Sequence, residues 1–418
     1  MRILFILHQF YPEFSGGTER ATLNLARCAQ HAGHYVRVLA STIEPVACGG
    51  QTSTEFDGAL EIIYQGVPVL LLPRTLLPVT ADFSFEVNLS LAERLADWIN
   101  FERFDVAHVS HLMRMSTTLL AVQRCGLPYV IMLTDFFSAC FRINLINALN
   151  KQCLGPNAGA QCARDCFVAP WTLDSLTGRY QQAKNLLTAA GARICPSNYV
   201  AERFRRFFPD LDFIVIPHGI DLLAVTANTQ LNKGVQKSVS DLTFGFIGAI
   251  ISQKGLDTLV RAFAQISEQR VKLLVVGGFY GDPVYSRDIL RLIEADSRIE
   301  LMGQVSPQKV FELIRKIDVL CLPSRVPETY SMVLHEAAAI GVPALVSDIG
   351  ASAEHVSKHG CGRVLPVDDV IAWAGAITEI IEQPEILSEW SSNLSVPLRI
   401  EEEAFFYESL YRRIIQIA

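Results

Sequence analysis

Residues 324–343 carry the sequence SRVPETYSMVLHEAAAIGVP. The apolar run before them, at 319–322, predicts a buried strand, and apolar residues at helical spacing follow the polar turn and end at Gly341. This pattern places Glu328 in a strand-to-helix loop and Glu336 about two turns into the helix. A strand, a loop and a helix in this order form the repeating unit of an α/β sheet protein.

The loop of this unit suits an anion. The amides of Thr329, Tyr330 and Ser331 are predicted to form the start of the helix, where unpaired N–H groups and the helix dipole favour a phosphate. With two carboxylates close by, the loop suits a ligand that carries both phosphate and hydroxyl groups, such as a nucleotide-sugar. The alternative is a surface helix with a capping hydroxyl and two solvated glutamates. Against it, Glu328 falls at the carboxyl end of a strand, where open α/β sheets bind ligands.

This stretch resembles the signature of the retaining nucleotide-sugar glycosyltransferases of family 4, in which two glutamates separated by seven residues precede a Gly-x-Pro. The resemblance implies an α/β fold of the GT-B type, with two Rossmann-like domains whose parallel sheets face an interdomain cleft. It also implies that the C-terminal domain holds most of the donor. Glu328 would then meet the sugar hydroxyls or the developing charge, and Glu336 the ribose.

Composition limits the class of protein. The chain has 418 residues, 50% of them hydrophobic, which is enough for two domains that each bury a core. A net charge of −7 without a basic run argues against a nucleic-acid partner, and no apolar segment is long enough to span a membrane. Residues 1–7 predict a first strand, because their apolar run is short for a signal peptide. Ten scattered cysteines are typical of reduced thiols in a cytoplasmic enzyme.

The strand and helix pattern runs through the chain twice. We predict an N-terminal, acceptor-side Rossmann-like domain over 1–221, with a cysteine-containing insertion at about 136–171, and a C-terminal nucleotide-sugar-binding domain over 222–395. Residues 226–240 are polar, lack periodicity and mark the boundary. The resemblance implies that a last helix, over 396–418, crosses back to the N-terminal domain.

A glycine pair stands at the first strand-to-helix turn. Gly16 and Gly17 allow the backbone to approach a ligand closely, and Thr18 is placed to cap the helix. Most glycine pairs mark only a tight turn. In family 4 the equivalent loop faces the donor phosphate and the acceptor, so the resemblance assigns donor binding to both glycines.

Polar side chains end two further strands of the first half. His108 and His111 end one, and Thr134 and Asp135 end the next. A histidine is more often a satisfied structural group than a catalyst, although the carboxyl end of a strand favours a place in a ligand site. The resemblance implies a histidine where Thr134 stands, and threonine carries no proton at neutral pH. Asp135 and His111 are therefore the candidate catalytic groups of this half, beside Glu328.

Four cysteines lie in the polar insertion: Cys140, Cys153, Cys162 and Cys166. Four thiolates can bind a structural zinc ion tetrahedrally, although their spacing lacks the usual pair of Cys-x-x-Cys knuckles. Reduced or disulfide-paired cysteines are the alternative. The length of the insertion also makes it a candidate lid over the acceptor side.

The second half repeats the pattern with groups that suit a phosphate. Gly248 follows a strand, and Lys254 precedes a helix, where its point charge suits a diphosphate. The family pattern has an arginine where Ala249 stands, and the nearby Arg325 is a candidate substitute. By resemblance, the backbone from Gly303 to Val305 would lie against the nucleotide base.

The predicted reaction moves a hexosyl unit from a nucleoside diphosphate sugar to a hydroxyl of a glycan, a lipid-linked saccharide or another acceptor, with retention at the anomeric carbon. Helix amides and Lys254 stabilise the leaving diphosphate, so no cofactor is required for catalysis. The expected location is the cytoplasm, with peripheral association at the inner membrane face for a lipid-linked acceptor.

Other classes compete with this prediction. A non-catalytic nucleotide-sugar-binding or assembly subunit of the same fold fits the departures at Thr134 and Ala249. A sugar-nucleotide epimerase shares the fold but needs acid–base groups that face the sugar. A dinucleotide oxidoreductase is disfavoured, because no Gly-x-Gly-x-x-Gly follows the first strand of either half. The base, the sugar and the acceptor stay open.

Overall fold

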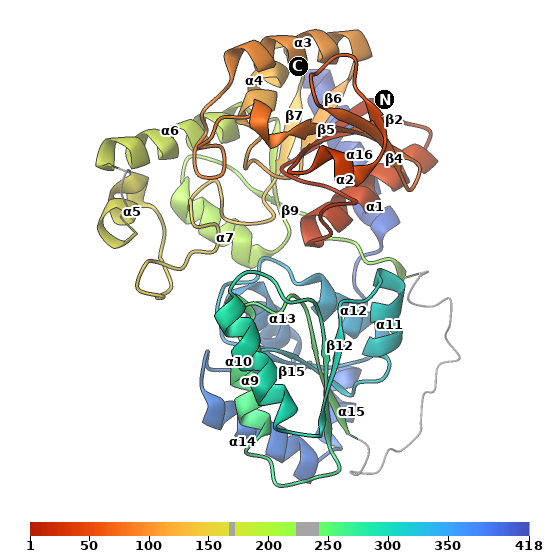
Figure 1. Ribbon diagram of the computed structural model, residues 1–418, viewed down its shortest axis with the longest axis vertical. Coiled ribbons are helices and arrows are strands. Elements are labelled where there is room, and N and C mark those ends of the chain that lie inside the picture. The colour runs from red at the N-terminus through yellow and green to blue at the C-terminus, as the bar shows by residue number, and fades with distance from the viewer. Residues whose placement is uncertain (167–171, 223–241, 418) are drawn as a thin grey trace. The chain divides into compact units, whose positions relative to one another are not determined.

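The computed structural model describes residues 1–166, 172–222 and 242–417. The segment expected to mark the domain boundary, 226–240, lies outside the described residues. The chain forms two compact units, Met1–Gly219 with Ile400–Ala418, and Ile220–Arg399 (Figure 1). Each unit is built on a sheet of its own and has its own buried core.

The first unit contains a nine-stranded sheet in the order β3-β4-β5-β2-β1-β6-β7-β8-β9. The strands from β5 to β9 in this order run parallel, and β3 and β4 add an antiparallel edge. The strands are β1 Arg2–Leu7, β2 Tyr35–Thr42, β3 Gln51–Thr52, β4 Leu60–Tyr64, β5 Val67–Pro73, β6 Val106–Val109, β7 Tyr129–Met132, β8 Ala192–Cys195 and β9 Ile214–Val215.

The central strand β1 shows why this sheet is buried. Its sequence is a continuous apolar run, which is typical of a parallel strand covered on both faces. Leu4 and Ile6 join one buried cluster, and Ile3 and Phe5 join another, because successive side chains point to opposite faces. The helices of this unit are α1 Gly17–His31, α2 Pro45–Cys48, η1 Arg74–Leu76, α3 Leu89–Glu102, α4 Ser116–Arg124, η2 Asn157–Gly159, α5 Ala160–Asp165, α6 Leu173–Ala189, α7 Asn198–Phe207 and α16 Ile400–Ile417.

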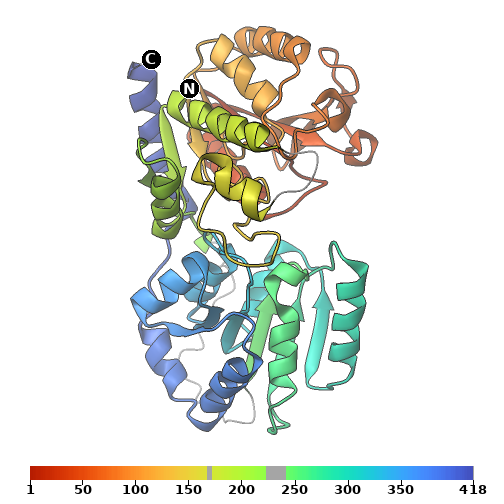
Figure 2. The same ribbon diagram turned by 90° about the vertical axis from the view of Figure 1, so that its left-hand side faces the viewer.

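The last helix, α16, belongs to the first unit. It packs along α1, and its Tyr407 and Tyr411 enter the same buried cluster as Phe5 of β1 (Figure 1 and Figure 2). The Tyr411 hydroxyl also lies 2.5 Å from Nδ1 of His108 on β6. The chain therefore returns to the first unit after it has completed the second.

The second unit contains a six-stranded sheet in the order β12-β11-β10-β13-β14-β15, and all of its strands run parallel. The strands are β10 Thr243–Ile247, β11 Lys272–Val276, β12 Ile299–Gly303, β13 Val319–Leu322, β14 Ala344–Ser347 and β15 Gly362–Leu365. The helices are η4 Ser252–Lys254, α9 Leu256–Phe263, α10 Pro283–Glu294, α11 Pro307–Ile314, α12 Met332–Ile340, α13 Gly350–His359, α14 Val370–Glu382 and α15 Ile386–Ser392.

Two sheets of parallel strands confirm the predicted α/β class. Open α/β sheets bind ligands at the carboxyl ends of their strands, so a ligand site is expected at that edge in each unit. None of the described helices is both long and apolar enough to cross a membrane.

Candidate active site

Glu328 lies in the loop between β13 and α12, as the sequence predicts. Its backbone pairs with Gly350 at the start of α13, and the Ala351 amide donates to its carbonyl oxygen at 2.7 Å. Gly350 has a φ of 80°, and a Cβ there would lie 2.5 Å from the Glu328 nitrogen. Only a glycine allows this approach, so Gly350 lets the backbone of the Glu328 loop pack against the start of α13.

The Glu328 carboxylate is held by two polar side chains. Lys254 Nζ lies 2.5 Å from Glu328 Oε1, and the Ser324 hydroxyl donates to the same oxygen at 2.7 Å. Burial raises the pKa of Glu328, but the Lys254 ammonium and the Ser324 hydroxyl outweigh it and hold the pKa below its ordinary value. The side chains of Lys254 and Glu328 keep 31% and 16% of their surface exposed, so a ligand can reach both.

The position of Lys254 depends on the glycine that follows it. Lys254 ends the short helix η4, and Gly255 then adopts a left-handed φ of 67° before α9 begins. A Cβ on Gly255 would lie 2.0 Å from the carbonyl oxygen of Pro323. The loop that carries Lys254 thus packs directly on the loop that carries Glu328.

Arg325 lies beside these residues but is committed to carboxylates. Its guanidinium makes two contacts of 2.7 Å with Asp257 and one of 2.5 Å with Asp368. It also donates to the Ser252 carbonyl at 2.8 Å and to the Thr258 hydroxyl at 3.1 Å. These five contacts match the five N–H donors of an arginine. The prediction that Arg325 replaces a phosphate-binding arginine at position 249 therefore finds no support in this geometry.

The helix after the Glu328 loop begins later than predicted. Ser331 precedes α12 with a left-handed φ of 65°, and it accepts from the Leu334 amide at 3.1 Å. The first-turn amides that point out of the helix therefore belong to Met332 and Val333. The prediction that 329–331 supply the first turn is wrong, because these residues form the turn before it. A role of Thr329, Tyr330 and Ser331 toward a donor stays a prediction.

The other predicted residues of the second unit lie near the same edge. Glu336 is 3% exposed and sits about one turn into α12. Gly248 follows β10, and its carbonyl oxygen would lie 1.9 Å from a Cβ on Gly277, which follows β11. Val305 follows β12 and packs half-buried against the core. The strand ends of the second unit thus gather its predicted donor-binding groups on one edge of the second sheet, whereas Gly16 and Gly17 belong to the first unit.

The first unit has a polar pair at the same edge of its own sheet. His111 Nε2 lies 2.6 Å from Asp135 Oδ2, and the Met113 amide donates to His111 Nδ1 at 3.1 Å. Because Nδ1 accepts, Nε2 carries the proton and donates to Asp135. The Phe137 amide fixes the other carboxylate oxygen at 2.8 Å. The Asp135 side chain keeps 26% of its surface exposed, against 4% for His111. Asp135 is thus the more accessible member of the pair, and the buried His111 positions it.

Two residues that sequence reasoning missed extend this pair. The ring of His8 stacks on His111 with centroids 3.9 Å apart, and Glu19 Oε1 lies 3.8 Å from His8 Nε2. Burial, His111 and two arginines hold the pKa of His8 well below its ordinary value, so His8 is neutral. We call His8, Glu19, His111 and Asp135 the first-unit cluster. In the sequence, the feature that indicates His8 is its position directly after the first strand.

The glycine pair serves Glu19. Gly16 is the N-cap of α1 and Gly17 its first residue, and the Gly16 amide donates to Glu19 Oε2 at 2.7 Å. A Cβ on Gly16 would lie 2.5 Å from that oxygen. The capping partner is thus Glu19, and Thr18 lies inside the helix instead of capping it. Donor binding by both glycines stays a prediction.

His108 is a structural histidine, the outcome that is more common for a lone histidine. It is fully buried on β6, with its Nδ1 against the Tyr411 hydroxyl of α16. Burial lowers its pKa to about 3. It therefore stays neutral and belongs to the contact between α16 and the sheet.

The four insertion cysteines are buried and free. Burial raises the pKa of Cys140 to about 11 and that of Cys162 to about 12. Across the described ranges, which leave out 167–171, no three His, Cys, Asp or Glu side chains are arranged to hold a metal ion. The zinc site considered for Cys140, Cys153, Cys162 and Cys166 stays a prediction, with reduced thiols as the alternative.

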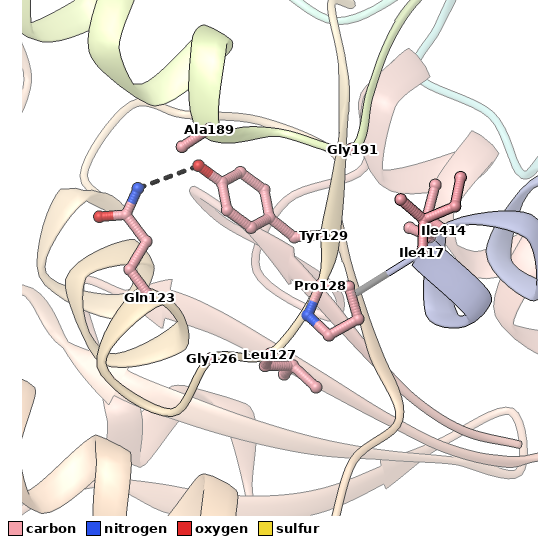
Figure 3. Close-up of a pocket in the computed structure, with 9 residues that line it drawn as sticks. All are labelled: Gln123, Gly126, Leu127, Pro128, Tyr129, Ala189, Gly191, Ile414 and Ile417. Atoms are coloured by element: carbon pink, nitrogen blue, oxygen red, sulfur yellow. Dashed lines mark hydrogen bonds between the residues drawn. The ribbon is translucent and has the colours of Figure 1, made fainter.

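A cavity of about 500 Å³ lies at the opposite edge of the first sheet (Figure 3). Pro128 and Tyr129 at the start of β7 line it, together with Ile414 of α16. The Tyr129 hydroxyl accepts from Gln123 at 3.0 Å and donates to the Leu186 carbonyl at 2.9 Å, so its hydrogen bonds are made within the wall. This cavity is at the amino edge of the strands, away from the first-unit cluster.

Known proteins match almost the whole chain. The family model described as Glycosyltransferase Family 4 matches residues 15–222, and the model described as Glycosyl transferases group 1 matches residues 241–383. The chain belongs to glycosyltransferase family 4. One relative of this glycosyltransferase is the D-inositol 3-phosphate glycosyltransferase of Xylanimonas cellulosilytica, which is 24% identical over 383 residues, or 88% of this chain and 84% of the relative.

Solved structures of similar fold align with the full length of this glycosyltransferase. Sucrose-phosphate synthase from Thermosynechococcus elongatus has a TM-score of 0.72 and 19% identity, with 100% of both chains covered. Alr3699/HepE of Anabaena, in complex with UDP and glucose, has a TM-score of 0.67 and 18% identity, with 100% of this chain and 99% of that chain covered. The predicted GT-B fold is confirmed, and membership of the family supports a transferase activity.

Proposed function

We propose that this glycosyltransferase moves a hexosyl unit from a nucleoside diphosphate sugar to a hydroxyl group, with retention at the anomeric carbon. The observation that carries the proposal is the pair of Lys254 and Glu328, a cation and a carboxylate 2.5 Å apart at the carboxyl edge of the second sheet. A ligand that joins a diphosphate to a polyhydroxyl ring offers each of them a partner.

Lys254 and the first turn of α12 are the groups proposed for the diphosphate. When the donor binds, the Lys254 ammonium exchanges the Glu328 carboxylate for a phosphate oxygen. The Met332 and Val333 amides lie at the positive end of α12 and can donate to the same group. Negative charge grows on the diphosphate as it leaves, and groups already in place stabilise it in the transition state.

Glu328 is the group proposed for the sugar. In the chain without a donor, Lys254 and Ser324 hold its pKa below the ordinary value, so the group is a carboxylate when the donor arrives. As a carboxylate it accepts from sugar hydroxyls and favours the positive charge that develops on the ring. The leaving phosphate itself takes the acceptor proton. These residues supply the charge stabilisation by themselves, so no cofactor takes part in the proposed reaction.

Asp135 is the group of the first unit proposed to meet the acceptor. Its carboxylate is oriented by His111 and by the Phe137 amide, and its side chain keeps 26% of its surface exposed. A preorganised carboxylate suits the hydroxyl of a glycan, a lipid-linked saccharide or a cyclitol, and the named Xylanimonas relative supports an acceptor of the last kind. We place the enzyme in the cytoplasm, with peripheral membrane association where the acceptor is lipid-linked.

The test begins with a thermal-shift panel of UDP-, GDP- and dTDP-sugars on the full chain, because a ligand that binds the native state raises its melting temperature. The neighbour crystallised with UDP and glucose makes UDP-glucose the first donor to try. The donor that stabilises the protein is then used in a transfer assay, with the anomeric configuration of the product read by NMR. Transfer with inversion, or no stabilisation by any nucleotide-sugar, overturns the proposal.

A second candidate function is nucleotide-sugar binding without transfer. Ala249 stands where the family pattern has an arginine, and Arg325 is occupied by Asp257 and Asp368. The diphosphate thus has one cation fewer than the family pattern supplies. A non-catalytic subunit would bind the donor in the same panel but release no nucleoside diphosphate with any acceptor, which separates it from the enzyme.

A further inference from the structure

Three basic residues lie at the carboxyl edge of the first sheet, and the proposed reaction does not use them. His8 directly follows β1, Arg74 begins η1 at the end of β5, and Arg114 lies between β6 and α4. The sheet runs β5-β2-β1-β6 with all four strands parallel, so their carboxyl ends share one edge. The first-unit cluster, which includes His8, lies at that edge as well.

Each of these side chains holds a buried nitrogen atom that lacks a hydrogen-bond partner within the described part of the chain. The atoms are Nδ1 of His8, Nε of Arg74 and Nη1 of Arg114. Nearly all buried polar atoms of native proteins are paired, and the exceptions mark bound water, ions or functional sites. The described chain holds other atoms of this kind, and these three are singled out because their elements share one edge of the sheet.

The two arginines are oriented by contacts with neighbouring side chains. Nε of Arg114 pairs with Asp82, and the Arg114 backbone has a left-handed φ of 65°, which is unusual for a side chain of this size. The Arg74 guanidinium lies over the Phe14 ring, 5.3 Å from its centroid, and reaches Gln9 Oε1 at 3.5 Å. Both guanidiniums are therefore oriented before any ligand arrives.

The two arginines act on each other and on the neutral His8. Burial and Arg114 lower the pKa of Arg74, against the opposing effect of Asp82 and Glu13. Burial, His111, Arg114 and Arg74 lower the pKa of His8. Two guanidinium charges thus repel each other in a partly desolvated place, and a bound anion would relieve this repulsion.

Most of the carboxylates nearby are engaged elsewhere. Asp82 pairs with Arg114, and Glu13 accepts from the Thr42 hydroxyl at 2.7 Å and from the Ile43 amide at 3.1 Å. In the first-unit cluster, Asp135 accepts from His111, and Glu19 Oε2 accepts from the Gly16 amide. Glu19 Oε1 faces His8 Nε2 at 3.8 Å and has no hydrogen-bond partner among the described residues. None of these contacts supplies the three open nitrogens.

We propose that His8, Arg74 and Arg114 form a subsite for an anionic group, a phosphate or a carboxylate, carried by the acceptor. This inference rests on the proposed function, because it names the class of acceptor. A guanidinium presents N–H pairs that match the oxygens of phosphate and carboxylate. The neutral His8 adds one further donor in the tautomer that carries its single ring proton on Nδ1. Asp135 would then accept from a hydroxyl of the same molecule.

The probe is inorganic phosphate, titrated calorimetrically into the full chain. Lys254 of the second unit also offers a cation, so every titration is made in the Lys254→Met background. Arg74→Gln and Arg114→Gln are each expected to weaken phosphate binding roughly tenfold to a hundredfold, the usual effect of losing a charged hydrogen bond. Arg124→Gln is the matched control, since this exposed arginine ends α4 of the same unit. It is expected to leave phosphate binding unchanged.

Acetate titrations and transfer assays with phosphorylated, carboxylated and neutral acceptors distinguish the two anions. The expected result is a KM for the anionic acceptor that rises in Arg74→Gln, with the KM for a neutral acceptor unchanged. If Arg114→Gln fails to fold, Arg74→Gln and His8→Asn decide. Phosphate affinity that is equal in all variants, or no phosphate binding at millimolar concentration, overturns the subsite. UDP binding is measured in parallel on the wild-type chain, which keeps Lys254, and its absence there counts against the proposed function alone.

Discussion

Lys254 Nζ lies 2.5 Å from Glu328 Oε1, although 74 residues separate the two in sequence. The contact depends on Gly255, whose left-handed turn lets the Lys254 loop pack against Pro323. Two loops from neighbouring strands thus hold opposite charges together in the absence of a ligand. In the proposed reaction the donor replaces this ion pair, so we expect the two residues to have separable effects on binding and turnover.

Glu328→Gln tests the role of the carboxylate. We expect kcat to fall about 100-fold or more, since the variant loses the negative charge next to the developing positive ring. UDP affinity should stay equal or become tighter, because Lys254 loses its competing partner. Steady-state kinetics and UDP calorimetry measure the two effects, with the exposed Glu300→Gln as control. Full turnover by Glu328→Gln would remove Glu328 from the mechanism.

Lys254→Met tests the cation. The variant loses a charge-assisted contact to the diphosphate, and we expect UDP to bind roughly tenfold to a hundredfold more weakly. Lys272→Met is the control, since Lys272 is exposed at the start of β11, the other edge of the same sheet. Equal UDP affinities in wild type and Lys254→Met would place the diphosphate elsewhere.

Arg325→Lys tests whether Arg325 supports the loops or binds the donor. Lysine keeps the charge but cannot reproduce the paired contacts with Asp257, so we expect the second unit to lose about 1–3 kcal/mol of unfolding free energy. Urea unfolding measures this loss, and the exposed Arg270→Gln serves as a control without measurable effect. If Arg325→Lys kept its stability and lost UDP affinity, the arginine would belong to the donor site after all.

The strand ends could be predicted from sequence for a simple physical reason. Buried parallel strands are continuous apolar runs, and the first polar residue after each run marks the carboxyl edge of the sheet. This rule found Gly248 and Asp135, and with the family signature it found Glu328. The same rule applies to His8, which is the first polar residue after β1.

Partners that are distant in sequence could not be predicted. Arg325 meets Asp257 and Asp368 across 68 and 43 residues, and the resemblance suggested a phosphate for it instead. The stacking of His8 on His111 likewise joins two different strands. The late start of α12 comes from the left-handed backbone of Ser331. A positive φ is uncommon for a serine, so the sequence does not predict it.

The insertion cysteines give a prediction about thiol chemistry. Because burial raises the pKa of Cys140 and Cys162, we expect them to react slowly with Ellman's reagent in the native protein and fully after denaturation. Cys48 is only half-buried, so it is the control that is expected to react faster with the reagent. Elemental analysis of the same sample should find zinc far below one equivalent. Stoichiometric zinc would restore the metal site that the sequence suggested.

His108 links the stability of the first unit to pH. Burial holds its pKa at about 3 in the folded chain, against an ordinary value of 6.5. Between these values the unfolded chain binds more protons, so the stabilisation present above pH 6.5 is lost as the pH falls, by about 1.4 kcal/mol per pH unit well inside this range. Urea unfolding at decreasing pH should show this loss, and His108→Asn should lessen its slope without abolishing it, because His8 is perturbed in the same direction. The exposed His31→Asn should keep the wild-type slope. An unchanged slope in His108→Asn would mean that acid sensitivity arises from other groups.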